Sequence, residues 1–235
     1  MTDRITVHNQ GNPIYDIVFQ RDFGEIAEEL RTMGLEQRKI CVVTDSTVAS
    51  YYLEEVQSAV SGCAAACTSF VFPAGEENKN LDVVRKLYEH LILHHFERKD
   101  LLIALGGGVT GDLAGFAAAT YLRGIDFIQV PTTLLSQVDS SIGGKTGVDF
   151  DSYKNMVGAF YMPRLVYINL SALKTLTERQ YLEGMGEIVK HGLIKDREYS
   201  FWLKEPMAEI RSRDLEVCRQ MIRRSCEIKR DVVEQ

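Results

Sequence analysis

The first three quarters of the chain alternate short apolar runs with amphipathic segments. The apolar runs, which have the composition of buried strands, cover residues 40–43, 70–72, 101–105, 127–130 and 165–168. The segments between them carry apolar positions at helical spacing, over residues 23–33, 48–60, 81–96 and 112–122. This alternation predicts an α/β fold with a Rossmann-like parallel sheet and crossover helices.

The two ends of the chain depart from this alternation. Residues 5–7 and 14–19 are β-forming and flank Gly11-Asn12-Pro13, which predicts an N-terminal β-hairpin. After Thr177 no strand-like run follows, and three helices are expected over residues 180–194, 199–204 and 214–233.

This change of pattern predicts two domains, an α/β domain over residues 1–176 and an all-helical domain over residues 177–235. The last helix reaches Gln235 without a Gly or Asn stop signal. We therefore expect only the start of the helical domain in this chain.

The overall charge favours a small-molecule ligand. Lys and Arg number 27 against 33 Asp and Glu, a formal net charge of −6, whereas proteins that bind nucleic acid or anionic membranes carry an excess of basic residues. No apolar run approaches the roughly 20 residues that span a bilayer, and the N-terminus lacks the apolar core of a signal peptide. We expect a cytoplasmic protein that binds neither nucleic acid nor membrane.

A glycine-rich turn follows the apolar run at residues 101–105. Gly106, Gly108 and Gly111 have the G-x-G-x-x-G spacing, and a segment of small residues follows them. Glycines let the backbone approach a pyrophosphate, and a helix N-terminus offers free N–H groups to it. The alternative is a tight strand-to-helix turn that binds nothing. Asp45, which ends an earlier strand, is placed either to accept a hydrogen bond from a ribose hydroxyl or to cap the next helix.

A second glycine turn carries a lysine. Gly143-Gly-Lys145-Thr146 resembles the end of a Walker A loop, but that motif requires a glycine at position 139, where the chain has Asp139. A nucleotide-triphosphatase is therefore excluded. Lys145, together with Lys154 and the neighbouring Asn155, suits a phosphate or a carboxylate, although exposed lysines without a ligand are common.

A third motif lies on the first predicted helix of the C-terminal part. Glu187, Lys190 and His191 share one helical face, either as an ordinary ion-pair group or as part of a site. Gly184 and Gly186 each cost this helix about 1 kcal/mol relative to alanine, which favours a close backbone or ligand contact.

Four long motifs, taken together and in order, resemble the 3-dehydroquinate synthase family. They occupy residues 105–124, 129–147, 154–160 and 184–192, and include Leu-Gly-Gly-Gly-Val-Thr-Gly-Asp and Gly-Met-Gly-Glu-Ile-Val-Lys-His-Gly. The resemblance implies a sugar phosphate cyclase, a carbon–oxygen lyase of the shikimate pathway. Such an enzyme uses NAD to convert 3-deoxy-D-arabino-heptulosonate 7-phosphate into 3-dehydroquinate with loss of phosphate. It also implies a divalent metal, zinc or cobalt, and a homodimer.

The resemblance assigns roles to individual positions. For NAD it implies contacts from Asp45, Gly75, Glu76, Lys79, Gly107, Gly108, Asp112, Thr132, Thr133, Lys174 and Thr175. For the anionic keto-acid phosphate substrate it implies Arg123, Asp139, Lys145, Lys154, Asn155, Lys190 and Lys229. It implies one metal ligand, Glu187.

The chain departs from the family pattern at the metal site. The resemblance implies two further histidine ligands beyond the last helix, and the chain ends at Gln235 before them. The resemblance implies no metal-ligand role for the position of His191. We therefore expect a truncated chain that binds metal weakly and is inactive alone. The alternatives are a related cyclase such as 2-deoxy-scyllo-inosose synthase, a polyol dehydrogenase, or a non-catalytic NAD-binding fragment.

Overall fold

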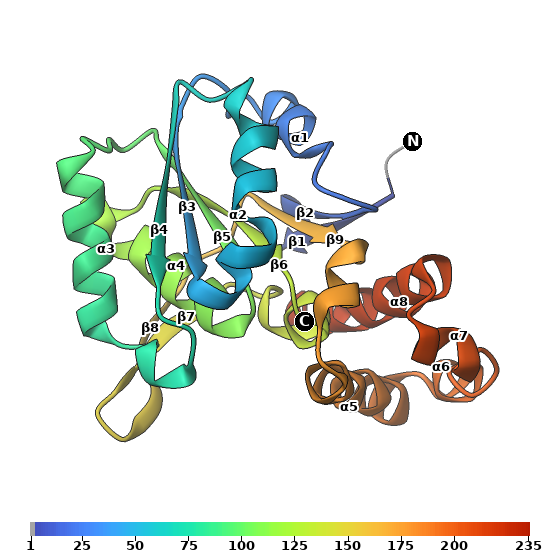
Figure 1. Ribbon diagram of the computed structural model, residues 1–235. Coiled ribbons are helices and arrows are strands. Elements are labelled where there is room, and N and C mark those ends of the chain that lie inside the picture. The colour runs from blue at the N-terminus through green and yellow to red at the C-terminus, as the bar shows by residue number, and fades with distance from the viewer. Residues whose placement is uncertain (1–2) are drawn as a thin grey trace.

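Seven strands form one sheet in the computed structural model, which describes residues 3–235 (Figure 1). In spatial order they are β1 (Arg4–Asn9), β2 (Asn12–Gln20), β9 (Leu165–Asn169), β6 (Asp126–Pro131), β5 (Leu101–Gly106), β3 (Lys39–Asp45) and β4 (Ala66–Phe72). Every neighbouring pair is parallel except β1 and β2, which are antiparallel. The predicted α/β fold with its N-terminal hairpin is confirmed.

Helices cover both faces of the sheet because its strands are apolar on both sides. The four crossover helices are α1 (Ile26–Thr32), α2 (Ser46–Ser61), α3 (Leu81–Leu93) and α4 (Gly108–Thr120). Alternate residues of β3 point to opposite faces: Ile40 and Val42 pack with α1 and α2, whereas Cys41 and Val43 pack with α3 and α4.

The end of the chain is helical, as predicted, and gathers at one end of the molecule (Figure 1). It contains α5 (Glu178–Lys195), α6 (Arg197–Trp202), α7 (Met207–Ser212) and α8 (Leu215–Val233). The short α7 was not predicted. These helices share a hydrophobic core with β1, β2 and β9, in which Tyr181 and Ile188 of α5 pack with Ile17 and Val166. The domain boundary after residue 176 stays a prediction.

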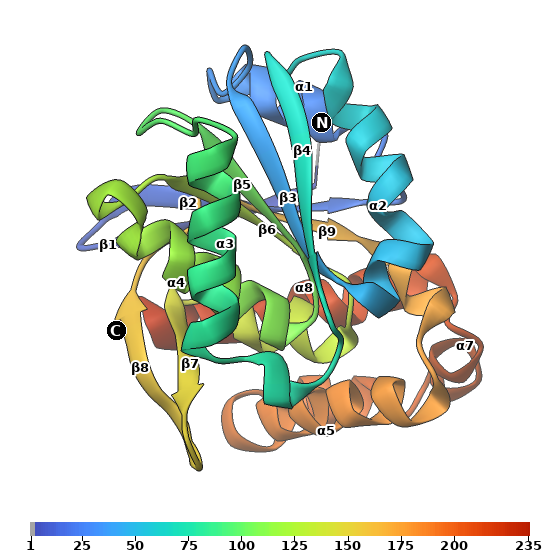
Figure 2. The same cartoon turned by 60° about the vertical axis from the view of Figure 1, so that its left-hand side comes forward.

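Two elements between β6 and β9 are absent from the sequence-based prediction. A π-helical turn, η3 (Ser136–Ser140), follows β6, and a separate hairpin of β7 (Lys145–Phe150) and β8 (Tyr153–Phe160) follows the turn. The hairpin projects beside α3 and α4 (Figure 2). The prediction also began α4 too late. The helix begins at Gly108, so Gly108 and Gly111 lie in its first turn and not in the loop before it.

No helix among residues 3–235 is long and apolar enough to cross a bilayer.

Helix α5 packs directly on the segment that leads into η3. A Cβ atom placed on Gly184 would lie 2.6 Å from Leu134 Cβ and 2.7 Å from Leu135 N, which is too close for any side chain. A Cβ placed on Gly186 would meet no atom within 4 Å. The predicted close backbone contact therefore holds for Gly184 and not for Gly186.

This difference supplies a matched pair of variants. We expect Gly184→Ala to lower the free energy of unfolding by about 1–3 kcal/mol, because the added methyl forces α5 away from Leu134. We expect Gly186→Ala to raise it by about 0.5–1 kcal/mol, because alanine favours the helix and nothing obstructs it. Urea unfolding followed by circular dichroism measures both. If Gly184→Ala proves as stable as Gly186→Ala, the described packing of α5 is wrong.

Candidate functional site

The residues implied to contact NAD lie along one edge of the sheet. Each group follows the carboxyl end of one parallel strand, and the groups come from five neighbouring strands. Gly75, Glu76 and Lys79 follow β4; Asp45 ends β3; Gly107 and Gly108 follow β5; Thr132 and Thr133 follow β6; Lys174 and Thr175 follow β9. Asp112 lies in the first turns of α4, after β5. Carboxyl ends of parallel strands are where ligands bind in open α/β sheets.

The strand order reverses between β3 and β5. After β3 the chain adds β4 at the sheet edge, and then crosses back to add β5 on the other side of β3. The connections on the two sides therefore diverge, and in open α/β sheets ligands bind in the crevice expected at such a point. Asp45 and the start of α4 flank the crevice.

Asp45 does cap the following helix. Its Oδ1 accepts hydrogen bonds from the backbone N–H groups of Thr47 at 2.9 Å and Val48 at 3.1 Å. Its Oδ2 lies 3.5 Å from Thr110 Oγ1. Capping therefore uses one carboxylate oxygen, and the second faces the first turn of α4.

The start of α4 is free of side-chain caps. Its N-cap residue is Gly107, which has no side chain to accept from the first N–H groups. A Cβ on Gly107 would lie 3.1 Å from Thr133 Cγ2, and one on Gly108 would lie 3.2 Å from Ser140 Oγ. The backbone is thus closely surrounded on one side, and its amides and positive dipole end remain available to an anion.

A pocket of about 560 Å³ lies beside this helix. Its walls come from α4, η3, the β7–β8 hairpin and α8, and include Asp112, Asp139, Lys145, Asn155, Phe160 and Lys229. The resemblance had assigned four of these six, Asp139, Lys145, Asn155 and Lys229, to the substrate. The fold brings these four together from segments that are far apart in the sequence.

Each carboxylate of the pocket is paired with a lysine. Lys79 Nζ lies 2.5 Å from Asp112 Oδ2, and Lys229 Nζ lies 2.5 Å from Asp139 Oδ1. Burial raises the pKa of Asp112 above the usual aspartate value, and the Lys79 ammonium opposes that rise. Lys145 forms no ion pair with any residue of the 3–235 range, so its charge is available to a ligand.

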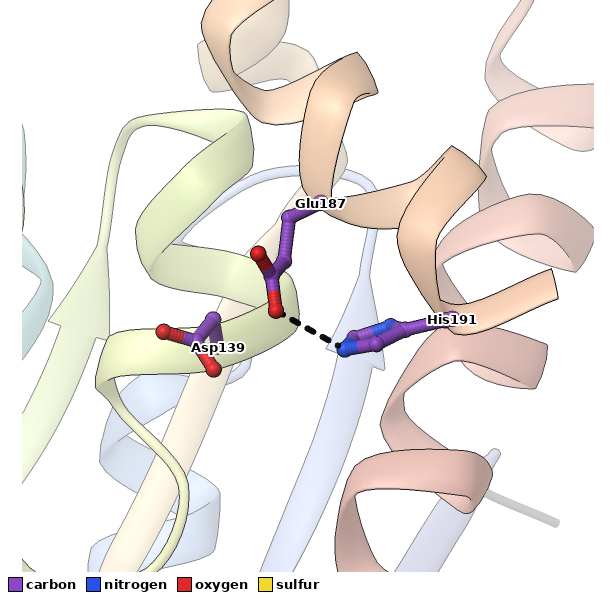
Figure 3. Close-up of side chains that lie close together, drawn as sticks. All are labelled: Asp139, Glu187 and His191. Atoms are coloured by element: carbon purple, nitrogen blue, oxygen red, sulfur yellow. Dashed lines mark ion pairs between the residues drawn. The ribbon is translucent and has the colours of Figure 1, made fainter. Parts of the chain in front are cut away.

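A possible cation site adjoins the pocket (Figure 3). Asp139, Glu187 and His191 each offer one ligand atom, and these atoms lie within 4.8 Å of one another. His191 Nε2 is 3.3 Å from Glu187 Oε1, and Lys190 also pairs with this oxygen. Glu187 Oε1 nonetheless makes no hydrogen bond of ordinary geometry, and His191 Nδ1 is buried without a partner among the described residues.

His191 is suited to metal binding in its protonation state. Its ring is almost fully buried, with 4% of the residue exposed, and this burial lowers the pKa below the usual histidine value, against the opposing effect of Glu187. The imidazole is therefore neutral at neutral pH, as a metal ligand must be.

Several implied substrate residues lie outside the pocket. Lys154 is exposed, and its Nζ lies 3.4 Å from Glu76 Oε1. Arg123 is exposed in a left-handed backbone conformation. Lys190 pairs with Glu187 beside Asp139. Two of the residues implied for NAD, Lys174 and Thr175, are also exposed, and Thr175 Oγ1 lies 2.5 Å from Tyr52 Oη.

Sequence reasoning missed some lining residues. Met156 and Phe160 line the pocket from β8, a strand that was not predicted. The place of Asp139 next to Glu187 was missed as well, because no sequence spacing links η3 to α5. The i, i+4 spacing of Glu187 and His191 was visible, and it correctly indicated one helical face.

Comparison with solved structures supports this fold. A 2-deoxy-scyllo-inosose synthase, complexed with carbaglucose-6-phosphate, NAD⁺ and Co²⁺, superposes with a TM-score of 0.85 at 26% identity, over 100% of this chain and 64% of that one. The 2-epi-5-epi-valiolone synthase ValA from Streptomyces hygroscopicus subsp. jinggangensis, with NAD⁺ and Zn²⁺ bound, superposes with a TM-score of 0.82 at 27% identity. That match covers 96% of this chain and 62% of ValA.

Sequence comparison identifies the family. The 3-dehydroquinate synthase of Acetivibrio thermocellus is 47% identical over 220 residues, which cover 94% of this chain and 61% of that protein. The chain thus spans about three fifths of this relative. The profile described as 3-dehydroquinate synthase N-terminal matches residues 69–183, and the one described as 3-dehydroquinate synthase C-terminal matches residues 184–235. This chain therefore belongs to the 3-dehydroquinate synthase family.

Proposed function

We propose that the protein is an NAD-dependent 3-dehydroquinate synthase that converts 3-deoxy-D-arabino-heptulosonate 7-phosphate into 3-dehydroquinate and phosphate. The activity is proposed for the whole protein, since this chain spans about three fifths of the A. thermocellus relative. The observation that carries the proposal is the pocket at the start of α4, in which Lys145, without an ion-pair partner among residues 3–235, lies beside a site suited to a dinucleotide.

NAD is proposed to bind across the crevice between β3 and β5. Asp45 Oδ2, which accepts only a long hydrogen bond from Thr110 Oγ1 at 3.5 Å, would accept from a ribose hydroxyl, and the amides of Gly107 and Gly108 would face the pyrophosphate. Gly75, Glu76, Thr132, Thr133, Lys174 and Thr175 are proposed as further contacts from the same edge of the sheet. The two cyclase structures compared above contain NAD⁺, which supports this cofactor.

The pocket is proposed to hold the anionic groups of the substrate. Lys145 and Asn155 would donate to phosphate or carboxylate oxygens, with Lys229 close by. Lys154 and Arg123 are proposed to contribute only if their exposed side chains turn inward. The substrate would thereby be held with its reacting carbon atoms next to the NAD crevice.

The cluster of Asp139, Glu187 and His191 fits a divalent cation. Its carboxylate oxygens and the neutral imidazole, which faces Glu187 through Nε2, suit zinc or cobalt. Lys190 and Lys229 already neutralise the two carboxylates, which weakens the attraction for a cation. When bound, NAD supplies a reversible hydride acceptor and the cation a Lewis acid.

A related cyclase activity is the second candidate, because a 2-deoxy-scyllo-inosose synthase has a similar fold over the whole chain. Product analysis separates the two. Release of phosphate from the heptulosonate phosphate, with dehydroquinate formed, supports the first; turnover of glucose 6-phosphate alone supports the second. NAD binding with turnover of neither would favour a non-catalytic NAD-binding fragment.

The NAD proposal is tested at Gly108. We expect Gly108→Val to weaken NAD binding at least 10-fold, because the valine methyl groups project from the first turn of α4, where the pyrophosphate would lie. The fold should persist, since the nearest atom to the new Cβ is the Ser140 hydroxyl at 3.2 Å. Isothermal calorimetry measures the affinity, and far-UV circular dichroism checks the fold.

Gly62→Val is the matched control, because a Cβ at Gly62 meets nothing within 4 Å at the end of α2. Equal NAD affinity in a folded Gly108→Val protein and in the Gly62→Val control would rule out the start of α4 as the pyrophosphate site.

The anion proposal is tested at Lys145. We expect Lys145→Ala to weaken the binding of inorganic phosphate by about 10- to 100-fold in the presence of NAD, since a charge-assisted hydrogen bond contributes roughly 1.5–3 kcal/mol. Lys86→Ala, at an exposed position of α3, should leave phosphate binding unchanged. Equal phosphate affinity in both variants would move the anion site elsewhere.

A further inference from the structure

Lys79 lies behind the wall of the pocket and does not line it. Only 4% of this residue is exposed, and its Nζ is held between Asp112 Oδ2 at 2.5 Å and Asn155 Oδ1 at 2.6 Å. Its backbone carbonyl accepts a hydrogen bond from Asp149 N at 2.8 Å, which fixes the loop after β4 to the β7–β8 hairpin. Both partners of its ammonium group line the pocket.

The ammonium group determines which way the Asn155 amide faces. A lysine ammonium has donors only, so Asn155 must turn its carbonyl oxygen toward Lys79. The two N–H donors of the same planar amide then point away from Lys79. The backbone of Asn155 is fixed as well, since its N–H donates to Asp149 Oδ1 at 2.7 Å. Asn155 is thereby prepared to donate to an anion in the pocket.

Lys79 also sets the charge of the pocket. The two carboxylates that line it, Asp112 and Asp139, are each neutralised by one lysine, Lys79 and Lys229 respectively. With both pairs intact, the charges of the two carboxylates and the two lysines cancel. Lys145 then gives the pocket a net positive charge. Without Lys79 the carboxylate of Asp112 would repel an incoming phosphate at short range.

We propose that Lys79 is a positioning residue of the anion site, which neutralises Asp112 and orients the Asn155 amide so that the pocket binds a phosphate or carboxylate group. The inference rests on the proposed anion site. It differs from the role that the family resemblance implies for Lys79, which is a direct contact with NAD.

The test compares phosphate and NAD binding in the same variants. Phosphate is titrated by calorimetry with NAD present, so that the start of α4 is occupied, and NAD is titrated separately. We expect Lys79→Met to weaken phosphate binding at least 10-fold and NAD binding less than about 3-fold. Lys86→Met, on the exposed face of α3, is the matched control and should change neither affinity.

A second variant separates positioning from loss of folding, because Lys79→Met leaves a partly buried carboxylate unpaired and is expected to destabilise the chain. Combining Lys79→Met with Asp112→Asn removes that charge. The double variant should regain part of the lost phosphate affinity, since repulsion is gone while the orientation of Asn155 is not restored. Thermal unfolding checks that both variants are folded.

The possible results distinguish the two proposals. If the unmodified chain binds no phosphate, the proposed anion site itself fails. If the unmodified chain binds phosphate and a folded Lys79 variant binds it equally well, the positioning role is wrong and the anion site stands. Loss of NAD binding with unchanged phosphate binding would also overturn the inference, and would support the direct NAD contact.

Discussion

The close approach of one face of helix α4 to β6 and β7 is the constraint on which the rest of the site depends. A Cβ atom on Gly111 would lie 2.6 Å from Gln129 Oε1 of β6, and one on Gly115 would lie 2.5 Å from Thr146 Cγ2 of β7. A side chain at either position would force Gln129 or Thr146 to move. One face of the helix therefore lies against both the sheet and the β7–β8 hairpin, and the pocket lies between the helix and the hairpin.

The same arrangement explains why the two carboxylates of the pocket are paired with lysines. A pocket built at a helix N-terminus between a sheet and a hairpin removes Asp112 from water, and an unpaired buried carboxylate is costly. Lys79, from the loop after β4, pairs with Asp112, and Lys229, from α8, pairs with the second carboxylate of the pocket, Asp139. Distant parts of the chain are therefore joined at one site. In the proposed anion site, each pair also neutralises a carboxylate that would repel an anion.

The sequence was sufficient to predict the elements that repeat a regular pattern. The apolar runs at β3, β5, β6 and β9 and the N-terminal hairpin were predicted because burial and alternation determine them. The β7–β8 hairpin was missed, because Gly147 and Gly158 face each other across it and glycine lowers the β-forming character of both strands. The π-helical turn η3 has no periodic signal that would reveal it.

The site could be predicted only in part. Glycine spacing and strand ends indicated where a dinucleotide would lie, and the family resemblance supplied single positions such as Lys145. Contacts between distant segments could not be predicted, because neither spacing nor composition links Asp139 to Glu187, or Lys79 to Asn155. Only the three-dimensional structure shows which residues line the pocket and which, such as Lys154, lie exposed outside it.

A structure of this chain crystallised with NAD and inorganic phosphate tests the central claim most directly, because the claim is that one edge of the sheet holds both ligands side by side. The account predicts the pyrophosphate against the amides of Gly107 and Gly108, a ribose hydroxyl on Asp45, and a separate phosphate on Lys145 and Asn155. Phosphate bound away from the pocket, or NAD bound away from the crevice between β3 and β5, would contradict it.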